Sequence, residues 1–208
     1  MHRSMKIVEY TPEYAEAISK MWSISSDGWN GEDVNQSPES VLREHENSTN
    51  LNTYIALRGD EVVGYCSLAR FSRDERALFI PLLNVPPKYH GKGIGKALVL
   101  QCVQRTVELS YPRLDLYTWP GNTKAVPLYK KCGFFWEKRD DSTHLMNFIP
   151  SVLSCEAVND YFKDIDWYTD TTRKIEIKPD GRKENDFDFF QYSWEKDGRS
   201  LKVESDGY

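Results

Sequence analysis

An apolar run that leads straight into a glycine-rich helix start constrains this chain more than any other feature. Residues Ala77 to Val85 are almost wholly apolar, which indicates a strand covered on both faces. From Gly93 to about Leu109, apolar residues occupy much of the helical circumference, as in a well-buried helix. Pro81 interrupts the strand, and because proline has no N–H to donate, the strand must be bulged or unpaired on one side there.

The loop between this strand and this helix predicts a phosphate site. It reads His90-Gly91-Lys92-Gly93-Ile94-Gly95-Lys96, with Lys88 just before it. A helix start offers unpaired N–H groups and a partial positive charge, and glycines let a phosphate come close to that backbone. Such a loop can bind a diphosphate, and the three lysines add positive charge around it.

Two familiar phosphate loops do not fit these residues. A Walker-type loop ending at Gly95-Lys96 would need glycine at His90 and Ser or Thr at Ala97. A dinucleotide fingerprint beginning at Gly91 would need a small residue at Lys96 and an acidic residue after a later strand. A third interpretation is a tight strand-to-helix turn without a ligand.

The order of strands and helices predicts an α+β fold with a central mixed, mostly antiparallel sheet flanked by helices. Hairpin turns are indicated at residues 58–61 and 140–142, and Gly133 marks a helix end. The expected strands are Met5 to Tyr10, Tyr54 to Leu57, Val62 to Leu68, Ala77 to Val85, Arg113 to Thr118, Phe134 to Lys138 and His144 to Phe148; the expected helices follow Pro12, Ser37, Gly93 and Asn122.

Pro150 marks the expected domain boundary, with a main domain at residues 1–149 and an extension at residues 150–208. The extension predicts a helix from Val152 to Phe162 and a small β-hairpin unit, with strands near residues 167–178, 187–195 and 200–203. This unit is too short to bury much core alone. We expect it to pack on the main domain or on a second copy of the chain, as in a homodimer.

Composition narrows the class of partner. Residues 1–150 hold 18 acidic and 18 basic side chains, so the net charge of −5 arises from the 14 acidic and 9 basic side chains of the rest. Without a basic stripe, nucleic acid is not an expected partner. No apolar stretch is long enough for a membrane helix, and the four cysteines are too widely spaced for a metal or disulfide framework. We therefore expect a cytoplasmic protein with no membrane association, no bound metal and reduced core cysteines.

The loop and a second motif together resemble the GNAT superfamily of N-acetyltransferases. The coenzyme A loop of that family has the form Gln/Arg-x-x-Gly-x-Gly/Ala, which residues 90–95 match at both glycines, with His90 at the first position. Asn122-x-x-Ala125-x-x-Leu128-Tyr129-x-x-x-Gly133-Phe134 resembles the later family segment, in which an asparagine-capped helix delivers a tyrosine. The similarity extends across residues 5–149.

The resemblance implies an acetyl-coenzyme A-dependent acyltransferase that passes its acetyl group directly to an amine, without a metal or a covalent enzyme intermediate. It places the cofactor diphosphate on His90, Gly91, Lys92, Gly93, Ile94, Gly95 and Lys96, with Asn122 as a further contact. It makes Tyr129 the proton donor to the departing thiolate, and backbone groups around Leu83 and Val85 the holders of the pantetheine arm and the carbonyl. Cys132 has no evident paired base, so we expect it to be inert.

The general base and the acceptor pocket stay open at this point. Candidate bases are Asp115, Asp74, Glu75 or a water chain to solvent. The acceptor is a small-molecule or peptide amine, and its pocket is expected from the first two helices and a hairpin, with Trp22, Asp27, Trp29, Glu32 and Asp33 as candidates and His144 as a structural residue. A non-catalytic acyl-coenzyme A sensor is the alternative function, and a longer acyl chain is equally compatible with the sequence.

Overall fold

The structure is a computed structural model that describes residues 4–25, 36–119, 121–136, 144–148, 174–178 and 189–205. The chain divides into two compact units, residues 1–161 and 162–208. The boundary expected at Pro150 and the helix expected at residues 152–162 lie outside the described residues, so both stay predictions.

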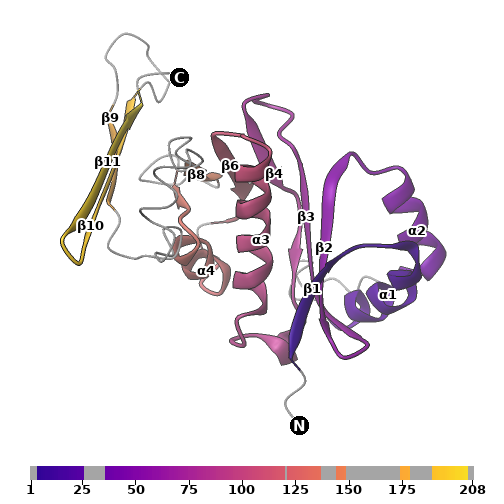
Figure 1. Cartoon of the computed structure of the whole chain (residues 1–208). Helices are drawn as coiled ribbons and strands as arrows, with labels where there is room; N and C mark the ends of the chain where they lie inside the picture. Colours follow the sequence, from indigo (N-terminus) through magenta and orange to yellow (C-terminus); the bar gives the residue numbers. More distant parts are fainter. Residues whose placement is uncertain are drawn as a thin grey trace. The chain divides into compact units, whose positions relative to one another are not determined.

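In the described part of the first unit, eight strands form one mixed sheet (Figure 1). The strand order is β1-β2-β3-β4-β6-β8-β7, and β5 pairs with β3 off this path. Only β4 and β6 run parallel among these pairs, which confirms the predicted mixed, mostly antiparallel sheet. The strands are β1 (Met5–Glu9), β2 (Asn50–Arg58), β3 (Glu61–Arg70), β4 (Ala77–Ile80), β5 (Leu83–Asn84), β6 (Arg113–Tyr117), β7 (Phe135–Trp136) and β8 (His144–Phe148).

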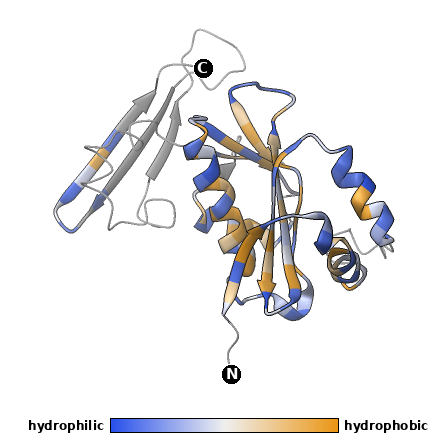
Figure 2. Cartoon of the chain, turned by 45° about the vertical axis from the view of Figure 1, so that its right-hand side comes forward, coloured by the Kyte–Doolittle hydropathy of each residue, from blue (hydrophilic) through white to orange (hydrophobic). Residues whose placement is uncertain are grey.

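Helices cover the sheet on both faces. A 3-10 turn, η1 (Pro12–Tyr14), leads into α1 (Ala15–Ser23), which lies with α2 (Pro38–Glu46) on one side, while α3 (Ile94–Glu108) and α4 (Ala125–Lys131) lie on the other (Figure 1). Apolar residues gather along the strands and on the inner sides of the helices, and the outer side of α2 is polar (Figure 2). This pattern follows from burying one stripe of each amphipathic helix.

Contacts across the sheet define its two faces. Cys66 of β3 lies 3.5 Å, sulfur to sulfur, from Cys102 of α3, and Asn147 of β8 donates to the carbonyl of Cys132 just after α4 (3.0 Å). We call this side the α3 face. Side chains alternate along a strand, so Tyr65 points to the opposite, α1 face, where its ring packs edge-on against Trp22 with centroids 5.3 Å apart.

The strand expected at residues 77–85 is broken at Pro81. Phe79 of β4 pairs with Ala69 of β3, whereas Leu83 of β5 pairs with Cys66, so four steps of one strand oppose three of the other. One residue is therefore inserted, which is a β-bulge. The register of β4 with β6 runs to Ile80, and β5 pairs with β3 alone among the described strands. The predicted bulge is confirmed, and the pairing with β6 ends there.

The second unit contains a three-stranded antiparallel sheet in its described part, ordered β11-β10-β9. Its strands are β9 (Lys174–Lys178), β10 (Phe189–Lys196) and β11 (Arg199–Ser205), which overlap the strands predicted near residues 167–178, 187–195 and 200–203. Asp197 and Gly198 link β10 to β11 with positive φ angles of 52° and 74°, as a tight hairpin turn requires.

Candidate active site

After Pro81, β5 has no described partner strand on the side of β6, and we call this side the gap. Alternate residues of an antiparallel strand direct their N–H and C=O groups to the same partner. The N–H of Ser67 donates to Leu82 O (3.0 Å), so Leu82 and Asn84 face β3. The main-chain groups of Leu83 and Val85 consequently point away from β3, to the side that β6 has left.

The glycine loop presents its backbone openly. After the 3-10 turn η3 (Pro87–Tyr89), Gly91 and Gly93 adopt positive φ angles of 73° and 79°, and a Cβ placed on either would meet no atom within 4 Å. Gly93 caps α3, and its carbonyl accepts the N–H of Ala97 (3.0 Å) as the first helical bond. The N–H groups of residues 94–96 therefore precede the helical hydrogen bonds and can bind an anion.

Ile94 and Gly95 contribute packing as well as backbone. A Cβ on Gly95 would lie 2.8 Å from Leu128 Cδ1, so α4 leaves no room for a side chain there. Ile94 is buried, and its Cγ2 would lie 2.8 Å from a Cβ on Gly64 of β3. These contacts hold the start of α3 against α4 and the sheet. Ile94 and Gly95 can therefore contact a ligand through their main-chain N–H groups.

The lysines around the loop differ in their contacts. Lys88 Nζ donates to Glu61 (2.8 Å), as does the hydroxyl of Tyr89 (2.6 Å), and these bonds lower the pKa of Glu61. Lys92 Nζ donates to the carbonyl of Lys88 (2.8 Å) and sits 4.9 Å from the centroid of the Tyr89 ring. Lys96 lies in the first turn of α3, which holds no acidic residue. The loop is thus positively charged and rigidly tied to β3.

His90 contacts the main chain of the broken strand. Its Nε2 lies 2.7 Å from Val85 O, and because a carbonyl only accepts, Nε2 carries the proton and donates. The side chain is exposed. This bond joins two residues that the sequence assigned separately to the cofactor, and it orients the second ring nitrogen, Nδ1, away from that carbonyl.

Tyr129 and Asn122 are placed by α4. Asn122 Oδ1 accepts the N–H of Ala125 (3.0 Å), which confirms the predicted cap, and Asn122 Nδ2 donates to Thr118 (3.1 Å). Tyr129 is buried, and burial, together with the neighbouring Cys66 and Cys132, raises its pKa well above the usual value for tyrosine. Its phenol stays protonated at neutral pH, as a proton donor requires. Because Tyr129 belongs to α4, it lies on the α3 face (Figure 1).

The carboxylates considered as bases have other partners. Asp115 is fully buried, and both of its oxygens accept from Arg113 (2.7 and 2.9 Å) while Oδ2 also accepts from His144 Nε2 (2.9 Å). Arg113 bridges on to Asp74 (2.9 Å), and Glu75 is exposed. Both oxygens of Asp115 are thus occupied by Arg113 and His144, which favours a structural role for this carboxylate in the sheet.

Of the acceptor residues named from the sequence, Trp22 alone lies in the described part of the chain. Trp22 is fully buried in the core between α1 and the sheet, which corrects its assignment to an acceptor pocket. Asp27, Trp29, Glu32 and Asp33 lie outside the described residues. Sequence reasoning missed a ring cluster on the α1 face formed by Phe71, Phe79, Tyr117 and His144, although the alternation of residues 113–117 was a signal for it.

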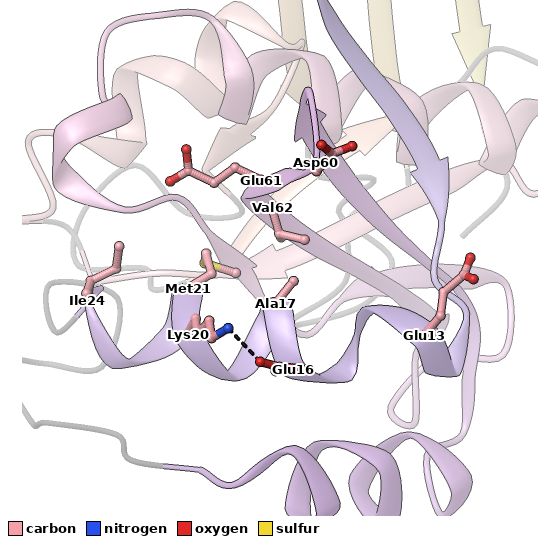
Figure 3. A pocket seen from close by; sticks show the side chains of 9 residues that line it. All are labelled: Glu13, Glu16, Ala17, Lys20, Met21, Ile24, Asp60, Glu61 and Val62. Atoms are coloured by element: carbon pink, nitrogen blue, oxygen red, sulfur yellow. Dashed lines mark hydrogen bonds and ion pairs between the residues drawn. The ribbon is translucent and has the colours of Figure 1, made fainter.

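A pocket of about 570 Å³ lies between α1 and the turn from β2 to β3 (Figure 3). Carboxylates surround an apolar floor, and Lys20 bonds to one of them, Glu16 (2.6 Å). None of the residues predicted to bind the cofactor lines it, so it is not the cofactor site. Its lining residues are Glu13, Glu16, Ala17, Lys20, Met21, Ile24, Asp60, Glu61 and Val62.

The described helices include none that is long and apolar enough to cross a membrane. Within the same residues, no group of three or more His, Cys, Asp or Glu side chains is placed to hold a metal ion. Three cysteines, Cys66, Cys102 and Cys132, are buried free thiols.

The sequence profile of the acetyltransferase (GNAT) family matches residues 16–134, which is more than half of the 208 residues. The chain belongs to this family. The match begins in α1 and ends just after α4, so it contains the broken strand, the glycine loop and Tyr129. These are the elements of the candidate site.

Similar GNAT proteins agree with this membership. The chain is 35% identical over 88 residues to N-alpha-acetyltransferase 30 of Xenopus laevis, covering 41% of this chain and 32% of that protein. It is 28% identical over 97 residues to the N-acetyltransferase YvbK of Bacillus subtilis, covering 46% and 60%. The matches thus span between a third and three fifths of the length of these relatives.

Solved structures show the same fold. The PaiA N-acetyltransferase of Thermoplasma acidophilum, crystallised in complex with coenzyme A, superposes with a TM-score of 0.56 at 19% identity, over 70% of this chain and 99% of that one. The ribosomal-protein-S18-alanine N-acetyltransferase of Escherichia coli gives a TM-score of 0.53 at 13% identity, over 70% and 94%. At these identities the similarity establishes the GNAT fold.

Proposed function

We propose that this protein is an acetyl-coenzyme A-dependent N-acetyltransferase that transfers acetyl to a primary amine directly, in a ternary complex. The observation that carries the proposal is the gap beside β5, where the main chain of Leu83 and Val85 turns outward next to the open glycine loop. Both features lie within the segment that matches the family.

The residues present fit coenzyme A. The N–H groups at the start of α3, with Gly91 and Gly93 leaving open space, suit the diphosphate, and Lys92 and Lys96 add positive charge. His90 can donate from Nδ1 when its ring is protonated. The outward main chain of Leu83 and Val85 suits the amide groups of the pantetheine arm and the thioester carbonyl.

The transfer step follows from these positions. The amine nitrogen forms a bond to the thioester carbon, and an N–H of the Leu83–Val85 segment stabilises the oxyanion that develops. The carbon–sulfur bond then breaks, and Tyr129 gives its proton to the departing thiolate. The attacking amine loses its proton to solvent, since Asp115 is already held by Arg113 and His144.

The acceptor is proposed as a small molecule or a peptide with a free amine, without nucleic acid, a membrane or a metal. Peptides are included because one relative is named an N-alpha-acetyltransferase and a structural neighbour is named a ribosomal-protein-S18-alanine N-acetyltransferase. We propose a cytoplasmic location and a role for the second unit in packing on the first or on a second copy of the chain.

A non-catalytic sensor of acyl-coenzyme A is the second candidate. It is favoured by the ion-paired Asp115 and by the lack of a carboxylate on β4 and β5. A sensor would bind coenzyme A without consuming its thioester.

The test measures free thiol released from acetyl-coenzyme A with spermidine, free lysine and short peptides bearing a free amino terminus. Calorimetry on the same protein measures coenzyme A binding. An acetyltransferase binds coenzyme A and releases thiol with at least one amine. Binding without release supports the sensor, and absence of binding rejects both functions.

A further inference from the structure

A buried carboxamide beside the proposed reaction centre has no hydrogen-bond partner. Asn84 is 2% exposed, and neither its Nδ2 nor its Oδ1 bonds to a protein atom in the structure described. Burial of an unbonded amide is unfavourable, so native proteins keep such groups rarely and often for function. The equally buried Asn147 differs in part: its Oδ1 also has no partner among the described residues, but its Nδ2 donates to Cys132 O (3.0 Å).

Asn84 lies between Leu83 and Val85, the two residues whose main-chain groups face the gap. It lies on β5 directly opposite Tyr65, so its side chain points to the α1 face. The side chains of its neighbours turn the other way: Leu83 Cδ2 and Val85 Cγ2 would lie 3.9 and 3.8 Å from a Cβ on Gly95 of α3. The carboxamide is therefore across the strand from α3.

The proposed proton donor and Asn84 lie on opposite faces of the sheet. Tyr129, the proposed proton donor to the thiolate, belongs to α4, which lies on the α3 face (Figure 1). A nucleophile attacks a thioester carbonyl from above or below its plane, and the face without Tyr129 is the face that carries Asn84. Two residues on that face, Leu82 and Tyr65, belong to the core packed under α1.

We propose, on the basis of the proposed acetyltransferase function, that Asn84 holds the attacking amine. Its Oδ1 accepts one N–H of a neutral primary amine, which leaves the nitrogen lone pair directed at the thioester carbon. A carboxamide carries no charge, so it binds the reactive neutral amine without stabilising the unreactive ammonium ion as a carboxylate would. Asn84 is thus an acceptor-binding residue, and the strand that holds the thioester also holds its nucleophile.

The experiment compares Asn84→Leu with wild type, using the amine that releases thiol fastest in the panel above. Leucine is close in size and removes both polar atoms. We expect kcat/KM for the amine to fall about 10- to 100-fold, since a hydrogen bond to the substrate is lost. Coenzyme A affinity should stay within about twofold, and the denaturation midpoint should stay equal or rise, because replacing an unbonded buried amide by an apolar group is neutral or stabilising.

Asn147→Leu is the matched control. It removes a buried asparagine on the α3 face that does bond to the chain, so we expect a lower denaturation midpoint with kcat/KM for the amine unchanged. If Asn84→Leu lowers the midpoint and keeps kcat/KM for the amine, Asn84 is structural and the inference is wrong. A wild-type protein that releases no thiol with any amine instead defeats the proposed function on which the inference rests.

Discussion

At the scale of single residues, the loop requires glycine at positions 93 and 95 for two different physical reasons. Gly93 needs a positive φ of 79° to begin α3, whereas Gly95 has ordinary backbone angles but faces Leu128 at 2.8 Å from a hypothetical Cβ. Only the first lies where an anion would rest, because the space around it is open. Changes at the two positions should therefore affect different properties.

Gly93→Val should abolish coenzyme A binding. Valine is β-branched and strongly disfavours a positive φ, so the start of α3 would shift and its N–H groups would lose their alignment. Calorimetry with coenzyme A measures this loss. Gly198→Val is the control, because Gly198 has a similar φ of 74° and equal open space but lies in the β10–β11 turn. Comparable loss of binding in both variants would show a general folding defect.

Tyr129→Phe should reduce kcat about 100-fold or more while coenzyme A affinity stays the same, since general acid catalysis contributes at about this level. Burial raises the pKa of Tyr129, and a phenol donates its proton only below its pKa, so kcat of the wild type should show no loss from this group below about pH 10. Thiol-release assays from pH 6 to 10 measure how kcat depends on pH. Full turnover in Tyr129→Phe would remove the proposed role.

Sequence reasoning at this scale succeeded where chemistry is local. The Asn122 cap depends on residues three apart in one turn, and the structure confirms it. It could not find the partners of Asp115, because His144, which bonds to that carboxylate, comes from another strand that only the sheet register brings close. The bond from His90 to Val85 O likewise depends on how η3 folds the loop back, which no residue pattern signals.

At the scale of elements, the strand and helix that bracket the loop were predictable because each satisfies a strong local rule. Helix α3 spans Ile94–Glu108 against an expected Gly93 to Leu109. The bulge followed from the missing N–H of Pro81. Strand β2 is longer than its apolar run suggested, because the polar residues Asn50, Asn52 and Thr53 also pair with β3 through their main chain.

Ser37→Ala should lower the free energy of unfolding by about 1 kcal/mol without changing coenzyme A affinity. Ser37 Oγ accepts the N–H of Ser40 (3.2 Å) at the start of α2, and such N-caps contribute about this much. Urea denaturation measures the change. Ser40→Ala in the same helix leaves the cap oxygen in place and should cost less than about 0.5 kcal/mol; an equal cost in both would argue against the cap.

At the scale of the whole molecule, a buried charge network joins the β3–β4 loop to the far strands of the sheet. Arg113 links Asp74 and Asp115, and His144 closes the network from β8. Strands β4 and β6 pair in parallel and are joined only through the long segment that contains α3, whereas β2 and β3 are joined directly by a short turn. The network therefore stabilises the half of the fold that carries the gap.

Arg113→Leu should cost about 3 to 5 kcal/mol of unfolding free energy, because it leaves Asp115 buried without its main counter-charge. Chemical denaturation at pH 7 measures this. Lys130→Leu, at an exposed site in α4, is the control and should change the free energy by less than about 0.5 kcal/mol. A small loss in Arg113→Leu would mean that the carboxylate is satisfied by its other partners.

Acid should weaken the same network. Burial raises the pKa of Asp74, but hydrogen bonds from Arg76 and the charge of Arg113 outweigh it and hold the pKa below its usual value. A carboxylate with a lowered folded-state pKa stabilises the fold above its unfolded pKa of about 4 and loses that contribution as pH falls further. Asp74→Asn should therefore flatten the loss of stability between about pH 4 and pH 2, as followed by thermal unfolding; an unchanged slope would contradict this.

The single residue inserted at Pro81 has a topological consequence. Removing one residue there would bring the strand back into step with β3 along its whole length. Leu83 would still pair with Cys66 and Asn84 with Tyr65, but the strand would run on from β4 without the bulge, and the outward main chain of Leu83 and Val85 would be carried back beside β6. A deletion of one amino acid would thus remove the gap beside β5 in which we propose that coenzyme A binds, while Asn84 kept its face of the sheet and most of the hydrophobic core stayed unchanged.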